Sequence, residues 1–152
     1  MRIGITGDTH GSIEAMEKIA KRKVSLDLWL HTGDFYSDAA RLEKLTGVKV
    51  EAVLGNNDFS KAFAEYNKTF SYLGYRILLT HGHKYSTTLM YKAKEEEANI
   101  VVYGHTHVPE IVWYEDILFI NPGSPSYPRG GSRPCFAVLE LFEKIMPEAR
   151  LH

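Results

Sequence analysis

The chain has 152 residues, a net charge of −1 and a single cysteine, Cys135. This length favours one domain over residues 1–152, and a charge near zero excludes a bulk attraction for nucleic acid or an anionic membrane. One cysteine excludes an internal disulfide and a cysteine-rich zinc site. The sequence lacks the apolar segment of a signal peptide and any apolar run of ~20 residues that would span a bilayer, so we expect a soluble cytoplasmic protein.

The first half of the chain alternates predicted strands and helices. Apolar, β-prone runs predict strands at 3–6, 28–32 and 50–54. Between the first two runs, an apolar face at helical spacing predicts a helix that follows the N-cap residue Ser12 and ends in a basic triplet at 21–23. A second helix is predicted over 38–45, stopped by Gly47. A short helix is considered over 59–68.

Paired strands dominate the second half. Two hairpins are predicted, one around Leu73-Gly74 and one around Glu115-Asp116. Apolar runs predict further strands at 76–80, 100–103 and 136–141, and a helix is predicted over 87–97. The segment 127–134 is rich in Gly, Pro and Arg, which is typical of an ordered loop near a site or of a mobile flap. We expect an α/β architecture of two stacked β-sheets with helices on the outer faces, the first half β-α-β and the second half antiparallel.

Five of the predicted strands run directly into glycine or histidine and then into residues that bind metals. The five segments are Thr6-Gly7-Asp8-Thr9-His10-Gly11, Gly33-Asp34, Gly55-Asn56-Asn57-Asp58, His81-Gly82-His83 and Gly104-His105-Thr106-His107. Alternate residues of an extended chain point to the same side, so Asp8 and His10 can reach one ion. Ligands of α/β sheets collect beyond the carboxyl ends of the strands, so all five segments are expected at one edge.

The candidate ligands combine carboxylate, amide and imidazole donors: Asp8, His10, Asp34, Asn56, His81, His105 and His107. This mixture suits Mn²⁺, Fe²⁺, Ni²⁺ or Zn²⁺. Seven ligands are too many for one tetrahedral ion and suit two ions that share a carboxylate. Two neighbouring ions clamp both oxygens of an in-line displacement and supply hydroxide at neutral pH, which fits hydrolysis of a small phosphoester. We expect two divalent ions, Mn²⁺ first, with Fe, Ni or Zn as the alternatives.

Taken in order, these motifs resemble those of the calcineurin-like metallophosphoesterase superfamily. Thr80-His81-Gly82-His83 and Ile120-Asn121-Pro122-Gly123-Ser124 are similar to its compact bacterial and archaeal phosphodiesterase branch, and the resemblance runs over residues 1–141. It implies two stacked mixed β-sheets flanked by helices, and a phosphodiesterase in which a metal-bridging hydroxide attacks phosphorus. It also implies two ligand sets, with Asp34 bridging: Asp8, His10, Asp34 and His107 for one ion, and Asn56, His81 and His105 for the other.

One position departs from the pattern of many family members. The residue after the ligand Asn56 is Asn57, where the family often has a histidine that protonates the leaving group. An amide cannot supply a proton, so Asn57 can only position a phosphate oxygen. We therefore predict a preference for esters whose leaving groups need little protonation, such as aryl phosphodiesters. His83 is either a substitute acid or an imidazole that lies exposed or behind the ligands.

The remaining candidates are assigned by residue type. Arg129 or Arg133 is expected to contact substrate phosphate, because arginine forms bidentate phosphate contacts, or else to be a solvated loop residue. His31, inside a strand run, is predicted to lie in the core or behind the ligands. Trp29 and Trp113 are expected to pack internally or to line a homo-oligomer contact.

Two other protein classes use related features. The metallo-β-lactamase superfamily also places His-x-His after a strand, but it requires an Asp-His pair two residues on, and Val108-Pro109-Glu110 stands there instead. The retromer subunit of eukaryotes resembles the compact branch and serves as a non-catalytic protein-interaction scaffold. In that subunit the first-motif histidine is replaced, whereas His10 is present here, so the complete ligand set favours an enzyme.

Overall fold

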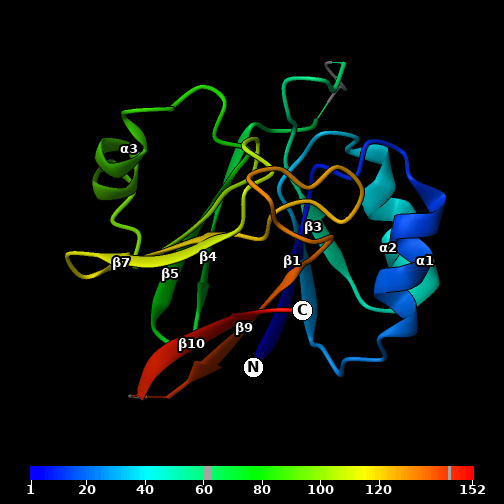
Figure 1. Ribbon diagram of the computed structural model, residues 1–152. Helices are drawn as coiled ribbons and strands as arrows, with labels where there is room; N and C mark the ends of the chain where they lie inside the picture. Colours follow the sequence, from blue (N-terminus) through cyan, green and yellow to red (C-terminus); the bar gives the residue numbers. More distant parts are fainter. Residues whose placement is uncertain (60–62, 144) are drawn as a thin grey trace.

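The computed structural model describes residues 1–59, 63–143 and 145–152 (Figure 1). Its helices are α1 (Ile13–Lys21), α2 (Ser37–Thr46) and α3 (Leu89–Glu95). Its strands are β1 (Arg2–Thr6), β2 (Leu28–His31), β3 (Val50–Ala52), β4 (Asn67–Tyr72), β5 (Tyr75–Thr80), β6 (Ile100–Val102), β7 (Glu110–Tyr114), β8 (Ile117–Asn121), β9 (Ala137–Phe142) and β10 (Ile145–Leu151). Figure 1 shows α1 and α2 together on one side of the molecule and α3 on the other, with the strands between them.

The strands form two five-stranded mixed sheets. The first has the order β10-β9-β1-β2-β3, with β1, β2 and β3 parallel. The second has the order β4-β5-β6-β8-β7. The hairpins β4–β5 and β7–β8 are antiparallel as predicted, but β5–β6 and β6–β8 are parallel, so the expectation of an antiparallel second half is wrong for these pairs. The crossover through α3 returns the chain to the same end of the sheet before β6 starts, and the outer strand β7 returns it again before β8, so both pairs are parallel.

Alternation along the strands divides the apolar side chains between the two faces of each sheet. Ile3 and Ile5 of β1 join Ile77 and Leu79 of β5 in a core between the sheets. Leu78, which points the other way, packs with Ala93 and its neighbours beneath α3. Both faces of these strands are therefore buried, which fixes their register, because a slip of one residue would reverse every side chain.

The helix signals in the sequence are confirmed to within a few residues. Ser12 caps α1 by accepting a hydrogen bond from the backbone N–H of Ala15 at 3.2 Å. Gly47 ends α2 in the left-handed conformation at φ 70°. α3 is shorter than the predicted 87–97. The helix considered over 59–68 includes residues 60–62, which lie outside the described residues, and β4 begins at Asn67. Within the described ranges, no helix combines the length and apolar character needed to cross a membrane.

β10 was not predicted from the sequence. It pairs antiparallel with β9 at the edge of the first sheet, and the pairing shifts register between Ile145 and Glu148. Pro147 lies in this irregular stretch, where a residue without an N–H costs no ladder hydrogen bond. A proline inside an apolar run argues against a strand. The strand β10 tolerates Pro147 because it lies at the edge of the sheet and the pairing is irregular there.

Candidate metal centre

The loops that follow β1, β2, β3, β5 and β6 meet at one edge, between the two sheets. His107 Nε2 lies 3.3 Å from Asp8 Oδ1 and 3.3 Å from His10 Nε2. His81, which follows a strand of the other sheet, lies 3.5 Å from Asp34 Oδ1 through its Nε2. The expected convergence of the strand-end segments is therefore confirmed.

Two compact donor sets stand at this edge. In one set, ligand atoms of Asp8, His10 and His107 all lie within 4.8 Å of one another, and in the other the same holds for Asp8, Asp34 and His81. Asp8 belongs to both sets. Asp34 also lies between them, because its second carboxylate oxygen is 3.9 Å from His10 Nε2. The two sets are thus adjacent and linked by carboxylates.

Asn56 and His105 lie at the exposed margin of the second set. Asn56 Oδ1 is 3.0 Å from His81 Nε2, and the His105 ring centroid is 5.2 Å from that of His81. The backbone N–H of His105 donates to Asp8 Oδ2 at 2.9 Å. Both side chains therefore adjoin the cluster, although neither belongs to its most compact donor sets.

Backbone carbonyls orient two of the imidazoles. His81 Nδ1 lies 2.9 Å from the carbonyl oxygen of Thr32, and His107 Nδ1 lies 2.7 Å from that of Tyr127. A carbonyl can only accept, so each Nδ1 carries the proton and each Nε2 presents a lone pair to the cluster. Histidines that bind metals are oriented by hydrogen bonds of this kind.

The two carboxylates have opposite electrostatic environments. Burial raises the pKa of Asp8 to about 7, although the N–H of His105 partly opposes this. Burial also opposes ionisation of Asp34, but the backbone and side-chain N–H donors of Asn57 hold its pKa below the ordinary value. Burial lowers the pKa of His81 to about 4, so its imidazole is neutral.

A divalent cation fits this environment. Asp8 Oδ1 is buried and has no hydrogen-bond partner among the described residues, and it faces the lone pair of His107 Nε2. Acceptors that face one another repel, and a cation between them would remove the repulsion. The donors are oxygen and nitrogen atoms, the types that suit first-row divalent metals.

Much of this cluster is held in an unusual backbone conformation. The left-handed region, with φ between 48° and 71°, contains five of the predicted ligands: Asp8, His10, Asp34, His105 and His107. Asp8 and His10 therefore converge through turns and not, as predicted, along an extended chain. Non-glycine residues in this region cost free energy and cluster at functional sites.

The sequence matches the calcineurin-like phosphoesterase superfamily domain over residues 1–144. The chain belongs to this superfamily. It is 34% identical to the probable metallophosphoesterase YsnB of Bacillus subtilis over 149 residues, which cover 93% of this chain and 85% of YsnB. It is 31% identical to the phosphodiesterase MJ0936 of Methanocaldococcus jannaschii over 140 residues, which cover 81% of this chain and 83% of that protein.

The fold of this phosphoesterase-superfamily chain is also found in Vps29. A solved structure of a Vps29 single mutant from Entamoeba histolytica superposes with a TM-score of 0.81 and 20% identity, covering 100% of this chain and 98% of the other. At this identity the likeness concerns the fold alone. The expected superfamily membership and the sandwich of two mixed sheets flanked by helices are both confirmed.

A buried hydrogen-bonded chain supports the ligand loops of the phosphoesterase domain. Gly33 N–H donates to His31 Nδ1, so His31 donates from Nε2 to Thr9 Oγ1 at 3.2 Å. Thr9 Oγ1 in turn donates to Asp38 Oδ2 at 2.6 Å, and Asp38 Oδ2 also accepts from the backbone N–H of Gly11. The placement predicted for His31 is confirmed. Asp38 was missed because the sequence marks it only as an acidic residue in the first turn of a helix.

Asn57 and His83 occupy different surroundings. Asn57 donates to both oxygens of Asp34, from its backbone N–H at 2.9 Å and from Nδ2 at 2.6 Å. A contact of Asn57 with substrate phosphate stays a prediction, and in this structure its amide is directed at Asp34. The His83 ring lies 5.3 Å from that of His81 and 5.8 Å from that of Tyr66, and it is half-buried beside the second donor set.

The loop over 127–134 is anchored to the site, in agreement with the first of its two predicted alternatives. Ser124 Oγ donates to the carbonyl oxygen of Asp8 and accepts from the N–H of Tyr127. Arg129 lines a hollow together with His10 and His107. Arg133 is exposed and is not among the residues lining that hollow, so Arg129 is the better placed of the two predicted phosphate contacts.

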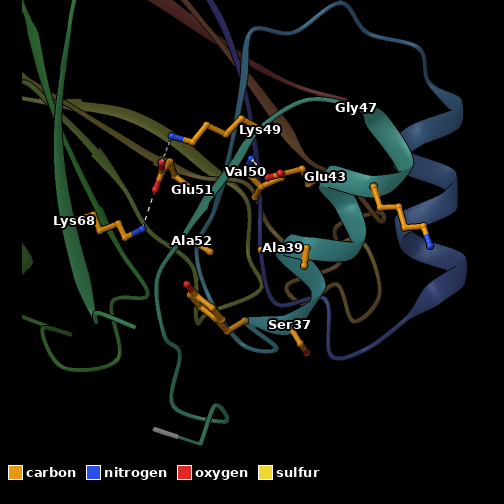
Figure 2. Close-up of a pocket in the computed structure, with 12 residues that line it drawn as sticks. Ser37, Ala39, Glu43, Gly47, Lys49, Val50, Glu51, Ala52 and Lys68 are labelled. Carbon is orange, nitrogen blue, oxygen red and sulfur yellow. Dashed lines mark hydrogen bonds and ion pairs between the residues drawn. The ribbon is translucent and has the colours of Figure 1, made fainter. Parts of the chain in front are cut away.

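A larger hollow of about 1070 Å³ lies away from these ligands, between α2 and β3. Figure 2 shows Lys49 and Lys68 directed at Glu51, with ion pairs of 2.6 and 2.8 Å. Glu51 is thus already paired with two lysines, Glu43 accepts from the backbone N–H of Val50, and none of the predicted metal ligands lines this hollow. Size alone therefore does not identify the functional site of this molecule.

Gly55 makes the closest approach of any glycine to a predicted metal ligand. A Cβ atom at Gly55 would lie 2.0 Å from Asp34 Oδ1 and 2.4 Å from the backbone nitrogen of Asp34. We expect Gly55→Ala to displace Asp34, to lower the free energy of unfolding by about 1–3 kcal/mol and to reduce bound metal. Metal analysis with thermal unfolding measures both. The control Gly131→Ala, whose Cβ would meet no atom of the described residues within 4 Å, should lose some stability through its φ of 75° but keep its metal.

Proposed function

We propose that the chain is a metal-dependent phosphodiesterase that holds two divalent ions. Asp8, His10 and His107 would hold one ion, Asn56, His81 and His105 the other, and Asp34 would bridge them. The observation that carries the proposal is the pair of donor sets that share Asp8 and have Asp34 between them. Membership of the superfamily and the similarity to the phosphodiesterase MJ0936 support hydrolysis of a phosphoester.

Divalent ions at this edge would supply Lewis-acid stabilisation of phosphoryl oxygens and a nucleophile from water at neutral pH. The protein's own groups prepare the site for this chemistry. The carbonyls of Thr32 and Tyr127 fix the His81 and His107 tautomers, and Asn57 fixes the carboxylate of Asp34. Arg129, which lines the hollow beside His10 and His107, would hold a phosphate oxygen.

We further propose Mn²⁺ as the resident metal. Carboxylate, amide and imidazole donors without thiolates favour a harder ion than the structural zinc of cysteine-rich sites. Fe, Ni and Zn use the same donors, so a metal analysis of protein purified without added metal distinguishes them.

The alternative is a non-catalytic scaffold that resembles the retromer subunit. The likeness to Vps29 is compatible with it, because the fold alone serves either role. The enzyme is favoured by the clustered side chains themselves, since a scaffold has no need to gather His10, His107 and Asp8 with the Nε2 lone pair of His107 turned toward Asp8.

A turnover assay separates the two proposals. We expect the Mn²⁺-loaded protein to hydrolyse bis(p-nitrophenyl) phosphate, a chelator to abolish turnover and added Mn²⁺ to restore it. The released p-nitrophenolate is followed by its absorbance. Protein that binds metal but turns over no ester in a panel of diesters and monoesters would support the scaffold.

A leaving-group series tests the consequence of Asn57. Because the amide cannot donate a proton to the departing oxygen, we expect kcat to fall steeply as the pKa of the leaving group rises from aryl to alkyl alcohols. The measurement is kcat for a set of diesters with one common non-leaving group. A flat dependence would show that another group, such as His83, acts as the acid.

A further inference from the structure

The hollow that Arg129 lines with His10 and His107 has a volume of about 460 Å³ and opens beside the first donor set. The residues that line it are His10, Phe35, His107, Tyr127, Pro128 and Arg129. Two of them are predicted metal ligands, so the hollow is continuous with the candidate metal centre. Its volume falls in the range of small-molecule sites.

Two aromatic side chains at this hollow are exposed. Phe35 is 38% exposed and Tyr127 is 59% exposed. Both rings contact the ring of His10, at centroid distances of 5.7 Å for Phe35 and 5.4 Å for Tyr127. Aromatic side chains left open to solvent at a site offer large apolar faces on which a ligand ring can stack.

The backbone holds Phe35 in this position at a cost. Its φ is 76°, in the left-handed region, and Asp34 before it has a φ of 53°. For a bulky residue this conformation is a rare and strained one. The next residue is fixed, because the N–H of Tyr36 donates to Asp58 Oδ1 at 2.7 Å. The turn that aims Asp34 at the donor sets therefore also carries Phe35 to the mouth of the hollow.

Tyr127 is fixed by the site itself. Its carbonyl oxygen accepts from His107 Nδ1 at 2.7 Å, and its N–H donates to Ser124 Oγ at 2.9 Å. The backbone of Tyr127 thus keeps its place relative to the predicted ligand His107, and its ring lies against that of His10. An anchored backbone reduces the ordering that binding of a ligand requires.

Arg129 adds a positive charge to the same hollow. Its backbone N–H donates to the carbonyl oxygen of His107 at 3.1 Å. Arg129 lines the hollow together with the predicted ligands His10 and His107, so the field of its charge reaches the first donor set. A phosphate near the metals would lie within reach of this field.

We propose that this hollow is a subsite for a planar aromatic group attached to the substrate phosphate, with the ring between Phe35 and Tyr127 and the phosphate toward Arg129. The proposal rests on the proposed function for the location of the phosphate. The ligand chemistry is a phosphate ester of a phenol or of a nucleoside. Stacking on an aromatic side chain changes affinity by about 5- to 150-fold per ring.

Calorimetric titration of the Mn²⁺-loaded protein with phosphate monoesters tests the subsite without turnover. We expect phenyl phosphate to bind about tenfold more tightly than methyl phosphate. Phe35→Leu and Tyr127→Leu should each reduce this ratio to about twofold or less. The control Tyr91→Leu, at an exposed position of α3, should leave the ratio unchanged. Thymidine 5′-monophosphate forms a third arm: binding as tight as that of phenyl phosphate points to nucleotides, and weaker binding points to aryl esters.

Equal binding of phenyl and methyl phosphate would overturn the subsite, as would a ratio that survives in both leucine variants. Because Phe35 has a strained backbone, thermal unfolding of Phe35→Leu is measured first, and Tyr127→Leu carries the test if that variant fails to fold. A ring preference without turnover of any ester would uphold the subsite and contradict the phosphodiesterase. Turnover of an ester without a ring preference would uphold the phosphodiesterase and contradict the subsite.

Discussion

Asp34→Asn and His107→Ala are each expected to lower turnover of bis(p-nitrophenyl) phosphate by about 10³-fold at saturating Mn²⁺. Asp34 lies between the two donor sets, so its charge would be shared by both ions. Loss of one metal ligand is expected to remove several kcal/mol of transition-state stabilisation, and each 1.36 kcal/mol is tenfold in rate. The measurement is kcat together with the metal content of each variant.

Controls of the same chemistry are available elsewhere in the chain. Asp116→Asn changes an exposed carboxylate in the β7–β8 turn, and His152→Ala removes an imidazole stacked on Phe136. Both should retain turnover within about twofold of the wild type. If Asp34→Asn or His107→Ala kept more than a tenth of the wild-type rate with full metal content, the assignment of these two ligands would be wrong.

Asp8→Asn is expected to stabilise the metal-free protein and to remove its response to metal. Burial raises the pKa of the Asp8 carboxyl from 3.8 to about 7. The folded state therefore holds a proton that the unfolded state has lost between these two pH values, and wild-type stability falls as the pH rises through this window. Asparagine does not ionise, so the variant escapes this loss.

The magnitude follows from the size of the pKa difference. We expect the variant to exceed the wild type in free energy of unfolding by about 3–4 kcal/mol at pH 8, and by about 2 kcal/mol less at pH 5. Urea unfolding in the presence of a chelator, at several pH values, measures the difference. His31 and His81, whose pKa values burial lowers to about 4, destabilise both proteins equally in acid and cancel in the comparison.

Added Mn²⁺ should reverse the order of stability. Wild-type protein gains about 2.7 kcal/mol at a metal concentration of 100 times Kd, whereas the variant lacks a ligand common to both donor sets. A Tm that rises with Mn²⁺ by the same amount in both proteins would contradict a role for Asp8 in metal binding. An Asp8→Asn protein no more stable than wild type at pH 8 without metal would contradict its protonation in the folded state.

Tertiary contacts decide that the pKa of Asp8 is raised and that of Asp34 is lowered. In the sequence both are an aspartate that follows a glycine and a strand. In the fold, Asn57 donates two hydrogen bonds to Asp34, whereas one oxygen of Asp8 has no partner among the described residues. The sequence therefore predicted two carboxylate ligands but not that, without metal, one would be charged and the other protonated.

The aromatic hollow also depends on tertiary contacts, because residues that are distant in the sequence form it. Phe35 follows β2 and Tyr127 follows β8, and nothing in their local patterns relates them. They come together through the loop after β1, because the Ser124 and Ser126 hydroxyls donate to the carbonyls of Asp8 and Thr9. The N–H of Asp8 in turn donates to the carbonyl of Gly33, close to Phe35. Local sequence signals do not encode contacts of this range.

By itself, the sequence determined the strand-end positions of all seven candidate ligands and the edge at which they meet, because parallel strands place their carboxyl ends together whatever the remaining topology. It also determined α1 and α2, whose caps are local interactions. Only the tertiary structure decided the parallel pairing of β6 with β5 and β8, the edge strand β10 and the left-handed turns at the ligands. Those features depend on which distant segments pack together, and a backbone strained at the ligands is tolerated only when that packing holds it in place.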